Sequence, residues 1–248
     1  MGCWLNVGVK GSATWPREET SIEFDGRTLL LKPATRDTEQ SIHIDLEEIS
    51  DVEALTLINR YLSVLSWCSD APMESLYGGY GTAVPVSAPR EPRAIGSSIG
   101  FQFYRNPETN EKVQLALALY REGLTVNSLP CAFLSYFKIL NMFWLDKTVT
   151  VNGKRENPIV DGIREVLPAL ADDLALDRLA TLRAREPDVA RYLYESGRCA
   201  IAHAYSDPIV DPDDISDLHR LSEDIHIVKA IAEHLIETQL GVSRSIFG

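Results

Sequence analysis

The chain has 248 residues, of which 45% are hydrophobic and 24% charged, enough for one large domain or two modest ones with buried cores. Its formal net charge of -12 argues against broad, sequence-independent binding of nucleic acid, because that mode needs many lysine and arginine side chains to neutralise phosphates; a small, focused site is still allowed. No apolar run is long enough to cross a membrane and no signal-peptide pattern opens the chain, so we expect a cytoplasmic protein without a membrane partner.

The cysteine and histidine spacings do not favour a metal site. The four cysteines lie far apart without a C-x2-C pair, which favours reduced thiols over a zinc site or a disulfide framework. His219, His226 and His234 recur two helical turns apart, too far for one metal ion. The patterns of P-loop proteins and of serine hydrolases are also missing. We therefore expect neither a metal nor a cofactor.

Residues 1–105 are predicted to form a small N-terminal α/β or α+β domain. Residues 21–32 alternate in polarity around Asp25-Gly26, a pair that favours a tight hairpin turn, and residues 40–46 suit another strand. We expect this domain to sense a trigger or to select a substrate.

The rest of that domain is predicted to contain a helix and a long loop. A helix is expected over residues 52–67, where apolar side chains recur at helical spacing behind Asp51, a suitable N-cap residue. Residues 75–100 are rich in Gly, Pro and Ser and predict an irregular loop, which leads to a last strand over residues 99–104.

Residues 106–248 have a helical pattern, which predicts an all-α bundle of about five or six helices and an α+β chain as a whole. One helix carries aromatic side chains such as Phe133 and Phe137 on its expected core face, and the last helix is expected to start at Pro212. A turn is expected at residues 151–154. The helical segments fall at residues 108–126, 130–145, 157–170, 174–185, 188–204 and 212–240.

Near the end of the fifth helical segment stands an Arg-x4-His-x-Tyr run formed by Arg198, His203 and Tyr205. A guanidinium can bind a phosphate, and an imidazole or a phenol beside it can move protons, which metal-free RNA cleavage requires. Requiring the four-residue spacing and the tyrosine lowers the chance expectation to about one in a hundred. Without the tyrosine, similar spacings occur twice more in the chain, at Arg36 with His43 and at Arg220 with His226.

This run resembles the R-x4-6-H motif of the HEPN fold and, with Tyr205, the R-x4-H-x-Y form of the toxins in HEPN/MNT toxin–antitoxin pairs. The resemblance covers residues 108–240. It implies a HEPN-like, dimeric, metal-independent endoribonuclease that cleaves RNA such as tRNA or mRNA, with Arg198 and His203 as the catalytic pair. It also implies a toxin or phage-defence role, an antitoxin or nucleotidyltransferase partner, and modification of Tyr205 by that partner. The N-terminal half more loosely resembles the MauJ-like proteins.

In a straight helix Arg198 and His203 would point about 140° apart and could not share a phosphate, since each residue turns by about 100°. Two arrangements would bring them together: a helix break at Ser196-Gly197, or a two-fold axis at which two copies each supply both residues. We expect both, with a stripe of small and apolar residues permitting close approach at a homodimer interface. The stripe consists of Leu193, Gly197, Ala200, Ile201 and Ala204.

In such a cleft His203 is expected to act as general base or acid while Arg198 holds the scissile phosphate. Arg191 and Tyr205 share a helix edge with Arg198 and, together with Glu195, are candidate substrate-binding or regulatory residues. In a purely structural alternative, Arg198 pairs with Glu195 and His203 caps a core edge. The functional alternative is a catalytically inactive HEPN-like bundle used for dimerisation and for binding a nucleotide or a protein.

Overall fold

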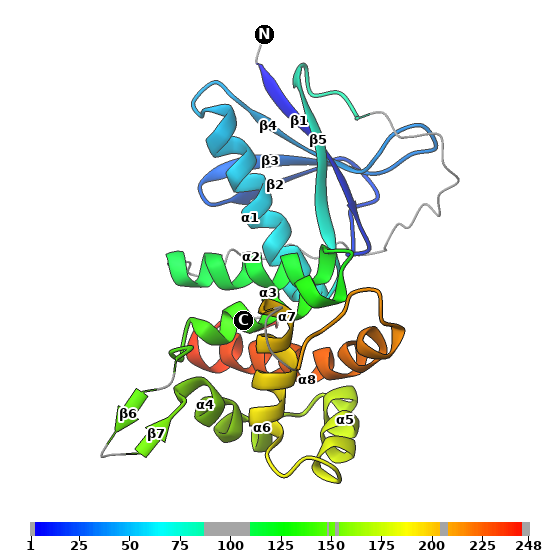
Figure 1. Ribbon diagram of the computed structural model, residues 1–248. Helices are drawn as coiled ribbons and strands as arrows, with labels where there is room; N and C mark the ends of the chain where they lie inside the picture. The colour runs from blue at the N-terminus through cyan, green and yellow to red at the C-terminus, as the bar shows by residue number, and fades with distance from the viewer. Residues whose placement is uncertain (1–2, 87–109, 148, 152–153, 204–207, 245–248) are drawn as a thin grey trace. The chain divides into compact units, whose positions relative to one another are not determined.

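The computed structural model of the chain is an α+β structure, as predicted, with a strand-rich part followed by a helical part (Figure 1). The described residues form two compact units, the first running to Thr125 and including the residues from Ser243 onward, the second running from Val126 to Val242. The division therefore falls after residue 125 and not after residue 105. The structure describes residues 3–86, 110–147, 149–151, 154–203 and 208–244.

Within the described part of the first unit, five strands form one antiparallel sheet in the order β2-β3-β4-β1-β5. The predicted hairpin joins β2 to β3 through Asp25 and Gly26, whose φ angles of 52° and 73° are the left-handed values that a two-residue hairpin turn needs. The predicted strand over residues 40–46 is β4. The strands are β1 (Trp4–Gly11), β2 (Thr20–Phe24), β3 (Arg27–Lys32), β4 (Ser41–Asp45) and β5 (Met73–Gly81).

Helix α1 (Asp51–Ser69) packs against the sheet and confirms the helix predicted over residues 52–67 (Figure 1). Its N-cap is Ser50 and not Asp51, because Ser50 forms a capping box: its Oγ accepts from the Glu53 amide at 3.3 Å, and Glu53 accepts from the Ser50 amide at 3.1 Å. Helix α2 (Glu111–Thr125) packs on α1 and completes the described part of this unit.

Strand β5 corrects the prediction of an irregular loop from residue 75 onward. Gly78 and Gly79 pair with β1 opposite Val7 and Asn6, so the glycine-rich run is an edge strand of the sheet. A Cβ atom on Gly78 would lie 3.4 Å from Leu5, which shows how closely the two strands pack there. The strand expected over residues 99–104 lies outside the described residues.

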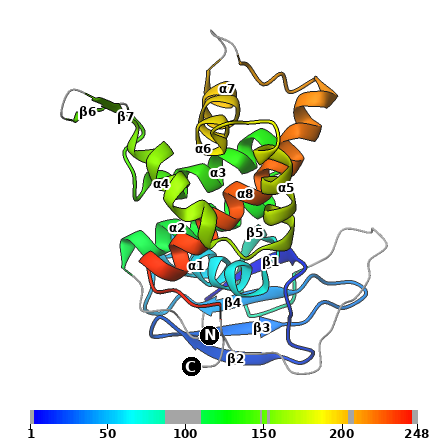
Figure 2. The same ribbon diagram turned by 90° about the horizontal axis from the view of Figure 1, so that it is seen from below.

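The second unit is helical, and its longest helix, α8 (Ile215–Gln239), packs against α3 and α5 (Figure 2). Helix α8 begins three residues later than predicted, because Asp214 caps it by accepting from the Ser216 amide at 2.7 Å. The other described elements are α3 (Leu129–Asn141), α4 (Pro158–Val166), the 3-10 helix η1 (Leu167–Ala169), α5 (Asp173–Arg183), α6 (Val189–Tyr192), the π-helix η2 (Leu193–Cys199), α7 (Ala200–Ala202) and the hairpin β6 (Val149–Val151) with β7 (Lys154–Glu156).

The core of this unit is built on the aromatic face of α3. Phe133 and Phe137 are fully buried with ring centroids 6.0 Å apart, as the sequence pattern predicts. Helix α4 closely approaches the segment that follows α3, since a Cβ atom at Gly162 would lie 2.1 Å from the ring of Trp144. Among the described helices, none is long and apolar enough to cross a membrane.

Candidate functional site

The helix that carries the motif differs from the single α-helix predicted over residues 188–204. Between α6 and α7 it widens into the π-helix η2, in which the Ala200 amide donates to the Glu195 carbonyl five residues back. Gly197 lies in η2 against Phe133 of α3, and a Cβ atom at Gly197 would sit 2.5 Å from the Phe133 ring. The helix therefore widens where it meets the aromatic core.

Three residues of the stripe expected at a homodimer interface are buried inside the second unit. Leu193 is fully buried, Ala200 is 2% exposed, and Gly197 packs on Phe133. Ile201 is only half-buried, and Ala204 lies outside the described residues. Three of the five stripe residues are thus used within the chain, which removes this argument for a dimer.

Arg198 and His203 come together within one chain, with the Arg198 Nη1 3.2 Å from the His203 Nε2. The helix ends at Ala202, and the backbone of His203 is extended (φ -131°, ψ 129°), while its amide still donates to the Cys199 carbonyl at 3.0 Å. Within one chain, the π-helix and this helix end bring the two side chains together, and a two-fold axis shared by two copies stays a prediction. Because a guanidinium only donates, the Nε2 of His203 is the acceptor in this contact.

Asp146 anchors the arginine of this pair. Its Oδ2 lies 2.5 Å from the Arg198 Nη2, and its Oδ1 accepts a hydrogen bond from the Tyr194 hydroxyl at 2.8 Å. Burial and the hydrogen bond to Asp146 raise the pKa of Tyr194, so the phenol remains a donor. Asp146 and Tyr194 were not among the residues predicted for the site. A signal for Tyr194 was its four-residue spacing from Arg198, which puts both side chains on one helix face.

Arg191 and Glu195 form a surface ion pair with each other. The Arg191 Nη1 lies 3.0 Å from the Glu195 Oε1, and the two side chains are 58% and 51% exposed. Glu195 therefore does not take the role of pairing with Arg198, which Asp146 fills. Tyr205, the third member of the motif, lies outside the described residues.

A buried carboxylate holds the other face of the π-helix. Asp224 of α8 is 1% exposed and accepts from the Arg178 Nε and from the Tyr192 hydroxyl, each at 2.8 Å. Arg220 donates to the Ser196 carbonyl of η2 at 2.9 Å and lies 3.4 Å from Asp224. Tyr192 and Tyr194, two residues apart, are thus fixed by carboxylates on opposite faces, and this sets the rotation of the helix that presents Arg198.

The other two Arg-to-His spacings, Arg36 with His43 and Arg220 with His226, do not contribute to this site. His43 is fully buried in the sheet of the first unit, where its ring contacts Asn6 and Ser41. Arg220 belongs to the Asp224 cluster described above. Across the described ranges, no three His, Cys, Asp or Glu side chains are grouped so that they could hold a metal ion.

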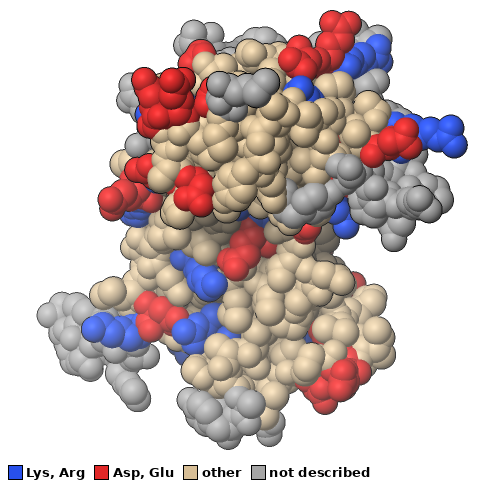
Figure 3. All heavy atoms as spheres, turned by 90° about the horizontal axis from the view of Figure 1, so that it is seen from above, with Lys and Arg blue, Asp and Glu red and all other residues tan. Residues whose placement is uncertain are grey.

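Charged side chains of both signs alternate on the face shown in Figure 3, where lysine and arginine lie beside aspartate and glutamate. On this face the described residues therefore form no broad basic patch.

Comparison with known protein families gives a match on the helical half of the chain. Residues 116–237, just under half of the chain, match the family model described as methylamine utilization protein MauJ. The chain resembles MauJ proteins. The predicted MauJ-like resemblance is thus confirmed, but it lies in the helical half and not in the N-terminal half. The MauJ-like region contains Arg198, His203 and Asp146. No curated protein and no solved structure matches the chain.

Proposed function

We propose that the helical unit cleaves RNA without a metal ion, using His203 to transfer a proton and Arg198 to hold the scissile phosphate. The observation that carries this proposal is the 3.2 Å contact between the Arg198 guanidinium and the His203 ring, since a cation and a titratable base side by side are what the reaction needs. The resemblance of the motif to HEPN ribonucleases and toxins points the same way.

In the proposed reaction the RNA 2′-oxygen attacks the neighbouring phosphorus, and the bond from phosphorus to the 5′-oxygen breaks. The 2′-hydroxyl loses its proton to a base, and the leaving 5′-oxygen gains one from an acid, so a 2′,3′-cyclic phosphate and a 5′-hydroxyl result. His203 serves as one of these two proton carriers. Arg198 stabilises the charge on the non-bridging oxygens.

The contact between the two residues has a consequence for this reaction. Without substrate, an Arg198 N–H occupies the lone pair of the His203 Nε2. A bound phosphate competes for the same guanidinium and releases that lone pair, so His203 becomes able to accept a proton where the substrate is. Asp146 keeps hold of Arg198 through its other terminal nitrogen and leaves further N–H donors for the phosphate.

The Asp146 contact also keeps the alternative function open. An arginine whose charge is balanced by a carboxylate stabilises the developing charge of a reacting phosphate less strongly, so the bundle would dock a nucleotide or a protein without cleaving RNA. Under that alternative, Asp146 masks Arg198; under the proposed function, Asp146 orients it.

Cleavage of a defined RNA in EDTA tests the proposal. The unchanged protein is expected to cut the RNA to products with 2′,3′-cyclic phosphate ends and to leave the 2′-deoxy analogue intact. Arg198→Ala and His203→Ala are each expected to lower the rate by about a hundredfold or more. Arg183→Ala and His219→Ala, at exposed positions of the same unit, are the matched controls and should retain the rate. Equal cleavage by all five proteins would show a contaminating nuclease and reject the proposal.

A further inference from the structure

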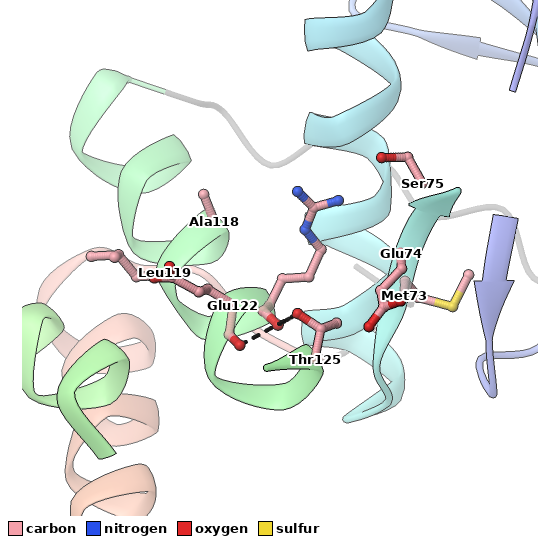
Figure 4. Close-up of a pocket in the computed structure, with 8 residues that line it drawn as sticks. Met73, Glu74, Ser75, Ala118, Leu119, Glu122 and Thr125 are labelled. Carbon is pink, nitrogen blue, oxygen red and sulfur yellow. Dashed lines mark hydrogen bonds between the residues drawn. The ribbon is translucent and has the colours of Figure 1, made fainter. Parts of the chain in front are cut away.

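The first unit contains a pocket of about 470 Å³ between α2 and the start of β5 (Figure 4). The labelled side chains in Figure 4 come from α2 on one side and from β5 on the other. Its lining combines apolar groups from Met73, Ala118 and Leu119 with charged groups of both signs, from Arg121, Glu74 and Glu122. Because every lining residue belongs to the first unit, the pocket is complete within it.

Arg121 places a poorly compensated positive charge in this pocket. Its Nη1 donates to the Asn59 Oδ1 at 3.1 Å, and the same oxygen accepts from the Ser75 hydroxyl at 3.2 Å. Burial lowers the pKa of Arg121, while the charge of Glu74 raises it. Within the described ranges this guanidinium contacts no carboxylate, so an amide oxygen is its side-chain acceptor and its remaining N–H donors are available to a ligand.

Glu74 faces the same pocket without a partner of its own among the described side chains. The two charges attract each other but do not form an ion pair. A small anion would meet Arg121 favourably and be repelled by Glu74 and by Glu122, which also lines the pocket. A small cation would be attracted by Glu74 and Glu122 and repelled by Arg121. A molecule that carries both charges satisfies both groups.

We propose that this pocket binds a small zwitterion, with a carboxylate on Arg121, an ammonium group on Glu74, and a short aliphatic part against Met73, Ala118 and Leu119. The two acidic residues disfavour a polyphosphate or a nucleic acid at this place. The proposal stands apart from RNA cleavage, which concerns the second unit. It gives the first unit a chemical role as a receptor for a small molecule.

Four probes of equal carbon number test the charge requirement by isothermal titration of the full chain: L-2-aminobutyrate, 4-aminobutyrate, butyrate and butylamine. At least one aminobutyrate is expected to bind saturably below about 10 mM, with butyrate and butylamine each at least about tenfold weaker, a difference of about 1.4 kcal/mol. No saturable binding of either aminobutyrate, or binding of butyrate with equal affinity, would overturn the proposal.

Two variants locate the binding. Arg121→Gln and Glu74→Gln are each expected to weaken aminobutyrate binding by about tenfold or more. If Arg121→Gln fails to fold, Arg121→Lys, which retains the charge but has no guanidinium, replaces it as the test variant. Arg60→Gln and Glu48→Gln are the matched controls, since both side chains form surface ion pairs of the same unit outside the pocket. Unchanged affinity in Glu74→Gln would reject the proposed ammonium contact.

Discussion

His43 shows how one buried side chain can link the stability of the first unit to pH. The Asn6 amide nitrogen donates to the Thr82 carbonyl at 3.0 Å, so its oxygen faces the His43 Nδ1 at 2.6 Å and accepts a hydrogen bond from it. The His43 Nε2 then accepts from Ser41 at 2.9 Å. This network needs the neutral ring. Burial, with a smaller effect of the Lys32 charge, lowers the pKa of His43 from 6.5 to about 4.

We therefore expect His43 to destabilise the fold as pH falls from 6.5 to 4. In that window the unfolded chain binds a proton at this residue and the folded chain does not, so acid favours unfolding, by about 3 kcal/mol once pH reaches 4. Above pH 6.5 this loss is absent. Urea unfolding of the unchanged protein and of His43→Gln at pH 7 and pH 4.5 measures the effect. An identical pH dependence in the two proteins would contradict it.

Asp146 is the residue on which the two candidate functions disagree. Asp146→Asn retains an acceptor for the Tyr194 hydroxyl but loses the charge that holds Arg198. If Asp146 orients Arg198, the variant should cleave RNA between about tenfold and a hundredfold more slowly, because small misplacements of a catalytic group are costly. Single-turnover cleavage, combined with an RNA-binding assay, gives the answer. Tighter RNA binding without cleavage would instead favour the docking bundle.

Residue spacing predicted the site only in part. Arg198 and His203 are close in sequence and form a pattern, so they could be found. Asp146 comes from the chain after α3, more than forty residues earlier, and no local pattern links it to Arg198. Packing of α3 against η2 brings them together, and no local sequence pattern reveals that packing.

At the level of elements, the close approach of η2 to α3 depends on Gly197. Gly197→Ala would place a methyl group against the Phe133 ring, and we expect a net loss of about 1–2 kcal/mol of stability even though alanine favours a helix by about 1 kcal/mol. Gly79→Ala is the control, since a Cβ atom there would meet nothing within 4 Å. Chemical denaturation measures both.

Relief of the clash provides a second check on this element. Phe133→Leu removes ring atoms that a Cβ atom on Gly197 would meet, so the two substitutions together should cost less than the sum of the two alone. Strict additivity would mean that the helix and the ring do not press on each other.

The element predictions succeeded where one periodic pattern extended over many residues, as for α1, α3 and α8. They failed at β5, where glycines that suggest a loop are held as a strand by pairing with β1. They also missed the π-helix Leu193–Cys199, which lies where Gly197 packs against the Phe133 ring of α3. Both misses are tertiary contacts overriding local sequence.

At the level of the whole molecule, the contact between Arg198 and His203 within one chain predicts that one copy supplies both residues of a cleft. A cleft that takes its arginine from one copy and its histidine from another would recover activity when Arg198→Ala and His203→Ala proteins are mixed. We expect no recovery, because each chain already brings the two together. Cleavage by the mixture, after co-refolding to allow exchange, would contradict this and support a shared cleft; gel filtration reports the oligomeric state of each sample.

The π-helix has a further consequence for the length of the chain near the motif. A turn of π-helix holds an extra residue, so η2 acts as a one-residue insertion that the helix absorbs without breaking. Removing one residue between Leu193 and Cys199 would let the segment return to ordinary α-helix, turning the chain beyond it by about 100°. Such a deletion ahead of Arg198 would turn Arg198 away from Asp146 while altering neither of them, so the spacing of this region is as much a part of the site as its side chains.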